Sequence, residues 1–259
     1  MTRRRATAGA ALSVALALQA CSTPAIRLAP TFEAGSVRRY TLSTESRTVF
    51  TGPGGDRALT STLAAETTLE VLGISPLGVL LGITVSPTSA TRDGAPIEPP
   101  PEQTAEVRVG PDGSLIEIVS DDATDTLGSF AASDLAGVLG PVVPEEEVAL
   151  GYRWEERNEG SIQRGRVVSL RRTQGIDCVV LSLSSSRTVE RRRSLDGRPL
   201  TLDGVERTAT TMDRSLEDGY PVRLETVANT SLTVRSGTLL GGSVVIEATT
   251  TMDRVPQVR

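Results

Sequence analysis

The stretch VRLETVANTSLTV, residues 222 to 234, places an apolar or small side chain at every second position and polar side chains at most positions between. Because successive side chains of a β-strand point to opposite faces of a sheet, this alternation predicts a strand with one covered and one solvated face. At roughly 3.3 Å a residue it would span about 40 Å, longer than an ordinary strand. The covered face would carry Val222, Leu224, Thr226, Ala228, Thr230, Leu232 and Val234, opposite Arg223, Glu225, Asn229, Thr233 and Arg235.

Two further stretches show the same period of two. The first places Ala65, Thr67, Leu69 and Val71 on one face and Thr62, Glu66 and Glu70 on the other. The second places Val244, Ile246, Ala248, Thr250 and Met252 on one face. We therefore predict a mainly β fold, with a large curved, half-barrel-like antiparallel sheet of long strands.

Turn signals separate these stretches. The dipeptide Asp-Gly is a common hairpin signal, and it occurs at Asp93-Gly94, Asp112-Gly113, Asp196-Gly197, Asp203-Gly204 and Asp218-Gly219. TGPGGD at residues 51 to 56 and GISPLG at residues 73 to 78 add two more reversals. Meander order is the simplest topology for such a series. The repeat of ATTMDR, ending at Arg214, and TTTMDR, ending at Arg254, agrees with it but is too short to establish a duplication.

One region departs from the period of two. Between Asp121 and Pro144, apolar residues come at mixed spacings of three and four, and Asp134 is a candidate helix cap. We expect a short helical insert around residues 125–140. Residues 36–259 are then predicted to form a single β-rich domain.

The N-terminus has the three-part layout of a secretory signal: Arg3, Arg4 and Arg5, an apolar run, and small residues at its end. The run is too short to span a bilayer. Its last residues, Leu18, Gln19, Ala20 and Cys21, resemble the bacterial lipobox. That resemblance implies a signal peptide over residues 1–20, cleavage between Ala20 and Cys21, and acyl chains such as palmitate on Cys21. An ordinary signal peptide with a chance cysteine is the alternative.

The predicted anchor has consequences for location. Acyl chains on Cys21 would tie the protein to a membrane, and residues 21–35 would form the tether. Ser22 follows the cysteine, where many enteric-type bacteria use aspartate to retain a lipoprotein at the inner membrane. We therefore expect an extracytoplasmic, membrane-anchored lipoprotein, at the outer membrane if the cell has two.

Composition excludes several kinds of chemistry. The chain has no histidine and no lysine, which excludes Ser-His-Asp and Cys-His catalysis, imidazole metal sites, Schiff bases and the P-loop. Carboxylate-only enzymes remain as a third class, and they need two carboxylates facing each other across a bond. Asp121, Asp122 and Asp125 lack the pattern of a calcium loop, so a solvated loop is favoured. Cys178 is interpreted as a buried, inert thiol. We expect no enzyme, cofactor or metal.

The net charge of the chain limits the kinds of partner that it can bind. Removing the signal peptide takes three arginines from a net charge of −5, which leaves −5 − 3 = −8. An acidic body repels phosphate backbones, so nucleic acid is excluded as a partner. Arginines cluster around one predicted hairpin, at Arg187, Arg191, Arg192, Arg193 and Arg198. Either they form a solvated turn, or Arg191, Arg192 and Arg193 contact anionic head groups or an acidic polymer.

Two sequence elements carry a family resemblance. TTMDRSLEDGYPVRLE, residues 210 to 225, resembles a strand-turn-strand element of Lol-type lipoprotein carriers and of LppX/LprG-like lipid-binding lipoproteins. Pro144, Val148, Gly151 and Trp154 form a segment similar to one common in envelope β-lipoproteins. The resemblance implies a half-barrel that binds an apolar or lipidic ligand without catalysis. The alternative is a structural or interaction lipoprotein with a solid core, and the few aromatic residues leave the cavity size open.

Overall fold

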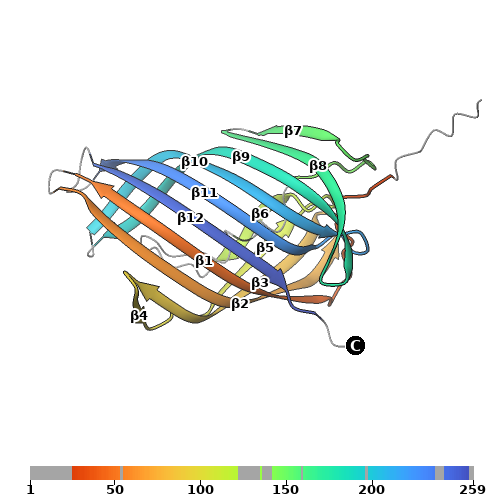
Figure 1. The fold of residues 1–259 in the computed structure, drawn as a ribbon, viewed down its shortest axis with the longest axis horizontal. Helices are drawn as coiled ribbons and strands as arrows, with labels where there is room; N and C mark the ends of the chain where they lie inside the picture. The colour runs from red at the N-terminus through yellow and green to blue at the C-terminus, as the bar shows by residue number, and fades with distance from the viewer. Residues whose placement is uncertain are drawn as a thin grey trace, which may run out of the picture.

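All strands of the computed structural model belong to one antiparallel sheet (Figure 1). The structure describes residues 25–52, 55–121, 135, 142–158, 160–195, 198–236 and 242–256. The strands are β1 (Val37–Thr51), β2 (Arg57–Ser75), β3 (Gly78–Arg92), β4 (Ala95–Ile97), β5 (Gln103–Val109), β6 (Leu115–Asp121), β7 (Arg153–Asn158), β8 (Ser161–Thr173), β9 (Ile176–Leu195), β10 (Arg198–Ser215), β11 (Pro221–Ser236) and β12 (Ser243–Arg254). The prediction of a mainly β fold with long strands is confirmed.

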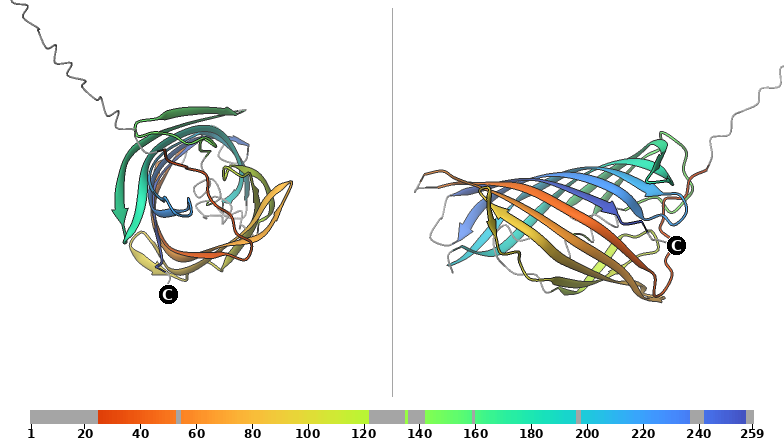
Figure 2. Two further views of the ribbon diagram at one scale, coloured as in Figure 1. Left: turned by 90° about the vertical axis from the view of Figure 1, so that its right-hand side faces the viewer. Right: turned by 60° about the horizontal axis from the view of Figure 1, so that its bottom comes forward.

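The sheet consists of two meanders joined at their ends. Its order is β6-β5-β3-β2-β1-β12-β11-β10-β9-β8-β7, with β4 paired to β3. Neighbours in this path are consecutive in the chain except at two places. β3 pairs with β5, and β1 pairs with β12, where Thr44 lies opposite Thr250. β6 and β7 are the two edges, so the sheet is open. Figure 2 shows how strongly it curls around its inner face, as the expected half-barrel shape requires.

The alternation in the sequence sets the inner and outer faces. In β11, every predicted inner residue is buried or half-buried, and Arg223, Glu225 and Arg235 are exposed. The same holds in β2, where Leu69 and Val71 are buried and Glu66 and Glu70 are exposed. The period of two therefore predicted the faces of both strands correctly.

Most predicted turns are at strand ends. Asp93-Gly94, Asp112-Gly113 and Asp218-Gly219 each lie between two strands, as do the predicted reversals near residues 52 and 76. Asp196-Gly197 lies outside the described residues. The prediction at Asp203-Gly204 is wrong, because both residues lie within β10. A Cβ on Gly204 would lie 1.9 Å from the carbonyl oxygen of Ser231, so this glycine permits close approach of β11 rather than a turn.

Two segments outside the strands close one end of the inner face. Ile26 and Val148 form an isolated antiparallel bridge, with both N–H···O distances at 2.9 Å. Ile26, Leu28 and Val148 are all buried in the main apolar cluster. Residues 26 to 30 of the predicted tether thus pack against the sheet. In Figure 2 this N-terminal segment crosses one end of the curled sheet.

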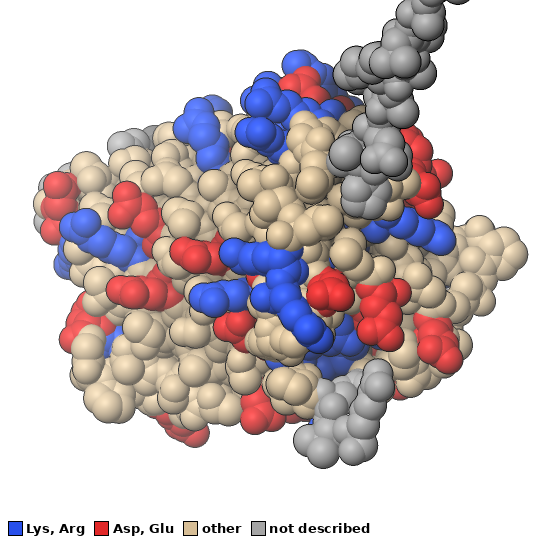
Figure 3. Space-filling view, turned by 45° about the vertical axis from the view of Figure 1, so that its right-hand side comes forward, with Lys and Arg blue, Asp and Glu red and all other residues tan. Residues whose placement is uncertain are grey.

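The outer face carries interleaved opposite charges. Arg164 and Arg157 both contact Glu155 at 2.6 Å, and Arg235 contacts Asp203 at the same distance. Figure 3 shows arginines and carboxylates distributed among uncharged residues on one face, rather than gathered by sign. Exposed pairs of this kind each contribute about 0–1 kcal/mol to stability. We therefore interpret the charged side chains of the outer face as a solvated surface.

The predicted helical insert around residues 125–140 lies outside the described residues, except for Leu135. This residue is helical and fully buried in the main apolar cluster. Within the described part of the chain, no helix is long and apolar enough to cross a lipid bilayer.

Candidate ligand-binding site on the inner face

The structure describes only some of the residues singled out from the sequence. Leu18, Gln19, Ala20 and Cys21 lie outside the described residues, so the lipobox stays a prediction. Arg191, Arg192 and Arg193 lie in β9 next to the β9–β10 hairpin, but their side chains are not described. Their contact with an anionic partner also remains a prediction.

The structure describes the candidate thiol and one residue of the acidic loop. Cys178 is fully buried in β9, as predicted, and burial raises the pKa of its thiol to about 11. Asp121 ends β6 and is exposed, whereas Asp122 and Asp125 lie outside the described residues. Within the described ranges, no three His, Cys, Asp or Glu side chains gather as a metal site would require.

The inner face is divided into three zones along the strands. In β11, Val222 and Leu224 are apolar, Thr226 to Thr230 are small, and Leu232 and Val234 are apolar again. Strands β1, β10 and β12 repeat this order in register. The main apolar cluster contains Leu42, Met212, Leu224 and Met252, and the distal cluster contains Leu202, Leu232, Val234 and Val244. Between them lies a zone of small side chains.

We call this middle zone the hydroxyl belt. It contains Thr44, Ser46, Ser61, Ser185, Thr208, Thr210, Thr226 and Thr250 together with Ala228 and Ala248. Its hydroxyls pair across strands: Ser46 with Ser61, Ser185 with Thr208 and Thr210 with Thr226 at 2.8 Å each, and Thr44 with Thr250 at 3.1 Å. Each of these eight hydroxyls therefore has a hydrogen-bond partner within the protein. Because most belt side chains are only half-buried, this zone leaves accessible surface on the inner face.

One ion pair borders the belt. Arg187 donates to Glu206 Oε1 at 2.7 Å, and Thr230 donates to Glu206 Oε2 at 3.4 Å. Glu206 is buried on the inner face of β10. Both carboxylate oxygens of Glu206 therefore accept a hydrogen bond from within the protein.

A cluster of arginines lies at the end that the N-terminal segment covers. Asp218, in the β10–β11 turn, accepts from Arg38 Nε at 3.2 Å and from Arg254 Nη2 at 2.8 Å. Burial opposes its ionisation, but the hydrogen bonds from Arg254 and from the Tyr220 backbone outweigh burial and lower the pKa of Asp218. The Arg38 guanidinium also lies 3.6 Å above the Tyr220 ring. Asp218 therefore forms ion pairs with two arginines, Arg38 and Arg254.

A third arginine in this region has no such partner. Arg214 is 1% exposed, and its Nε donates to the carbonyl of Gly219. Its Nη1 has no hydrogen-bond partner, and among the described residues no carboxylate lies within ion-pairing distance. Burial lowers the pKa of Arg214 to about 10, so the guanidinium is still charged at neutral pH. The buried hydroxyls of Tyr40 and Tyr220 are also unpartnered.

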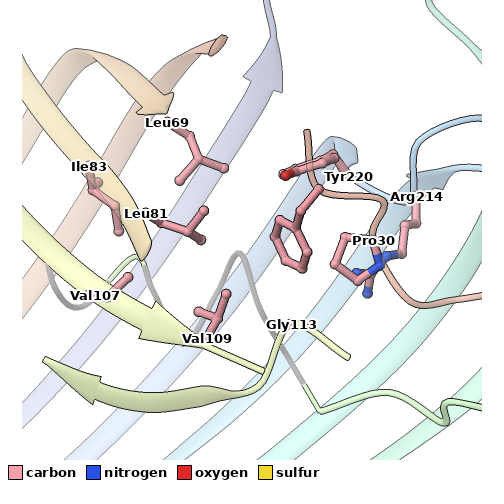
Figure 4. Close-up of a pocket in the computed structure, with 10 residues that line it drawn as sticks. Pro30, Leu69, Leu81, Ile83, Val107, Val109, Gly113, Arg214 and Tyr220 are labelled. Atoms are coloured by element: carbon pink, nitrogen blue, oxygen red, sulfur yellow. The ribbon is translucent and has the colours of Figure 1, made fainter. Parts of the chain in front are cut away.

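Arg214 and Tyr220 line a small apolar cavity (Figure 4). Leu69, Leu81, Ile83, Val107 and Val109 form one side, and Pro30, Tyr220 and Arg214 form the other. The cavity volume is about 20 Å³, enough for about one water molecule. A buried cation beside apolar side chains suits a molecule that is anionic at one end and apolar at the other.

Arg214 is not among the site residues predicted from the sequence, although the sequence contains a signal for it. The repeated hexapeptide ends in Arg214 and Arg254, and both arginines follow inner-facing methionines by two residues. Two residues further along a strand, a side chain returns to the same face. The repeat thus places both arginines inside.

Comparisons with known proteins show a similar fold but give no activity for this chain. No protein-family model and no curated protein matches this chain. Its fold is similar to that of lipovitellin, in a structure concerned with lipid–protein interactions, with a TM-score of 0.50 and 13% identity. The match covers 88% of this chain and 26% of that one, so the chain spans about a quarter of the lipovitellin chain.

Two further structures match with lower scores. They are an outer membrane lipoprotein-sorting protein domain from Vibrio parahaemolyticus and a DUF1329 family protein from Desulfovibrio piger. Each is 11% identical and covers 85% of this chain and 87% of its own, with TM-scores of 0.19 and 0.21. Scores this low carry no argument about this chain.

Proposed function

We propose that this chain is a lipid-anchored, non-enzymatic lipoprotein of the cell envelope that binds a lipidic molecule along its inner face. The observation that carries the proposal is the hydroxyl belt between two apolar clusters. Ser, Thr and Ala fill less volume than Leu or Met, and each paired hydroxyl already has a partner within the protein. An alkyl chain lying along the belt would therefore leave these hydrogen bonds in place.

The anchor is proposed from the lipobox at Leu18 to Cys21. Four residues lie between Cys21 and Ile26, where the chain packs into the sheet. The five steps from Cys21 to Ile26, at about 3.5 Å each, reach no more than about 18 Å. Acyl chains on Cys21 would thus hold the covered end of the sheet close to the bilayer. With Ser22 after the cysteine, the outer membrane is the proposed location in a cell with two membranes.

Fold similarity adds support of a general kind. This chain is similar in fold to about a quarter of lipovitellin, whose structure concerns lipid–protein interactions. A lipid ligand for this chain is our proposal and requires its own test.

A solid-core structural lipoprotein is the second candidate. The cavity at Arg214 has room for about one water, and the apolar side chains around it are packed together. In this alternative, the protein docks to envelope partners through surface loops and has no small-molecule ligand.

Native mass spectrometry after mild detergent extraction distinguishes the two candidates. We expect the wild-type chain to retain lipid, and Ala228→Leu/Ala248→Leu, which adds bulk to the belt, to lose most of it. Ala209→Leu, on the outer face of β10, is the matched control and should retain lipid like wild type. A wild-type chain free of lipid would favour the solid core.

The anchor is tested separately in a bacterial host supplied with radioactive palmitate. Wild type should incorporate label and fractionate with membranes, and Cys21→Ala should do neither. A labelled Cys21→Ala chain, or an unlabelled wild type, would contradict the anchor without bearing on the ligand.

A further inference from the structure

Arg214 is a buried cation, and the carboxylate in its cluster, that of Asp218, already pairs with two other arginines. Asp218 is bound by Arg38 and Arg254, and Arg214 reaches only the backbone of Gly219. Asp112 acts on Arg214 electrostatically, but its Oδ1 accepts from the backbone and hydroxyl of Ser114 at 3.0 and 2.7 Å. A buried charge without a partner is costly. An anion at Arg214 Nη1 would supply the missing acceptor.

The surroundings of Arg214 restrict what the anion can be. Across the cavity from Arg214, Leu69, Leu81 and Val107 present only aliphatic surface. A small inorganic ion would leave this surface unused, whereas an alkyl tail would cover it. A ligand that fits this site must therefore carry one anionic group and one apolar part.

A short segment currently occupies the space above the site. Pro30 and Phe32 line the cavity, and Thr31 N donates to the Asp218 carbonyl at 2.9 Å. Phe32 also packs edge-on against Tyr220, with ring centroids 5.9 Å apart. A ligand larger than one water must displace this segment. The same segment leads to the predicted lipid anchor.

We propose that Arg214 binds the anionic head group of an amphiphile whose tail replaces Pro30 and Phe32 against Leu69, Leu81 and Val107. This inference rests on the proposed lipid-binding function and names its ligand class: a carboxylate or phosphate joined to an alkyl chain. Arginine suits either head group because its N–H donors match both geometries.

Calorimetric titration with three probes of equal chain length tests the inference. The probes are palmitate, palmitoyl lysophosphatidylglycerol and the uncharged monopalmitoylglycerol, each added to the full chain carrying Cys21→Ala. We expect at least one anionic probe to bind about tenfold more tightly than the neutral one, as a charge-assisted hydrogen bond predicts. The better of the two anionic probes identifies the head group as carboxylate or phosphate.

Variants then assign the preference to Arg214. Arg214→Gln should lose the roughly tenfold preference while binding the neutral probe within about twofold of wild type. Arg223→Gln removes an exposed outer-face arginine and should keep the preference. If Arg214→Gln does not fold, Arg214→Lys replaces it and should reduce the preference, because the ammonium lacks the forked donors of the guanidinium.

The outcomes separate the two proposals. Equal affinity of wild type for all three probes, or an unchanged preference in the Arg214 variants, overturns the inference and leaves lipid binding intact. Failure of wild type to bind any probe contradicts the proposed function itself.

Discussion

Gly204 shows how one residue sets the spacing between two strands. It lies inside β10 opposite Leu232 of β11, where a Cβ would come within 2.9 Å of the Leu232 Cα as well as 1.9 Å of the Ser231 carbonyl oxygen. These are backbone atoms, which cannot rotate away. Without a side chain at position 204, the two strands approach closely beside the distal cluster.

Gly204→Ala should therefore destabilise the fold by at least about 2 kcal/mol, since the clash moves backbone rather than a side chain. Urea denaturation followed by circular dichroism measures the change. Gly73→Ala, in β2 with open space around the added Cβ, is the matched control and should change stability by less than about 1 kcal/mol. Equal effects of the two substitutions would show that β11 does not approach β10 as described.

At the scale of elements, the edge strand β7 is fastened by the single tryptophan of the chain. The Trp154 ring covers Gly165 of β8, and its Nε1 donates to the Val142 carbonyl at 3.0 Å. Gly151, with φ of 84°, turns the chain so that its N–H reaches the Val167 carbonyl at 2.9 Å. The segment with Pro144, Val148, Gly151 and Trp154 thus ties β7 and the N-terminal bridge to the sheet.

Gly165→Ala should displace the Trp154 ring, because the new Cβ would fall 2.0 Å from a ring carbon. We expect a red shift of tryptophan fluorescence and a loss of about 1–3 kcal/mol of stability. Gly73→Ala, in β2, also adds a methyl group to a glycine within a strand but meets no ring, since nothing lies within 4 Å of the added Cβ. It should leave the emission maximum unchanged, and an unchanged maximum in Gly165→Ala would contradict the stacking of Trp154 on Gly165.

At the scale of the whole molecule, the covered end buries several groups that must stay uncharged. Burial raises the pKa of Tyr220 to about 12 and raises that of Tyr40 further. Burial also raises the pKa of Cys178 from 9.0 to about 11. Arg214 acts in the opposite sense, because burial lowers its pKa to about 10. Three acidic groups thus have raised pKa values, whereas one basic group has a lowered pKa.

The free energy of unfolding should therefore fall as the pH rises from about 9 to 12. Over this range the unfolded chain releases thiol and phenol protons that the folded chain retains, so it binds fewer protons and is favoured. Arg214 opposes the trend only above about pH 10. Urea midpoints at pH 8, 9, 10 and 11 measure the slope, which Cys178→Ala should reduce from pH 9 upward. A midpoint constant from pH 8.5 to 11 would contradict the burial of these groups.

Particular residues show which features of the fold the sequence predicted and which it did not. The faces of β2, β11 and β12 followed from the period of two, because alternation is a local property of the strand backbone. Asp203-Gly204 was assigned to a turn, because sequence alone does not distinguish a glycine that reverses the chain from one that admits a neighbouring backbone. Residues 26 to 30 were predicted as tether, although Ile26 and Leu28 pack in the core, because their partner Val148 is far away in the chain.

The amino-acid sequence by itself determined the strand periodicity, most reversals and the types of chemistry available, since these depend on neighbouring residues and on composition. It also carries the predicted anchor at Cys21. Only the tertiary structure decided that β12 pairs with β1 and that Arg214 lies without a carboxylate beside an apolar cavity. The physical reason is that burial and ion pairing depend on which distant residues meet, and here Asp218 is closer to Arg38 and Arg254 than to Arg214.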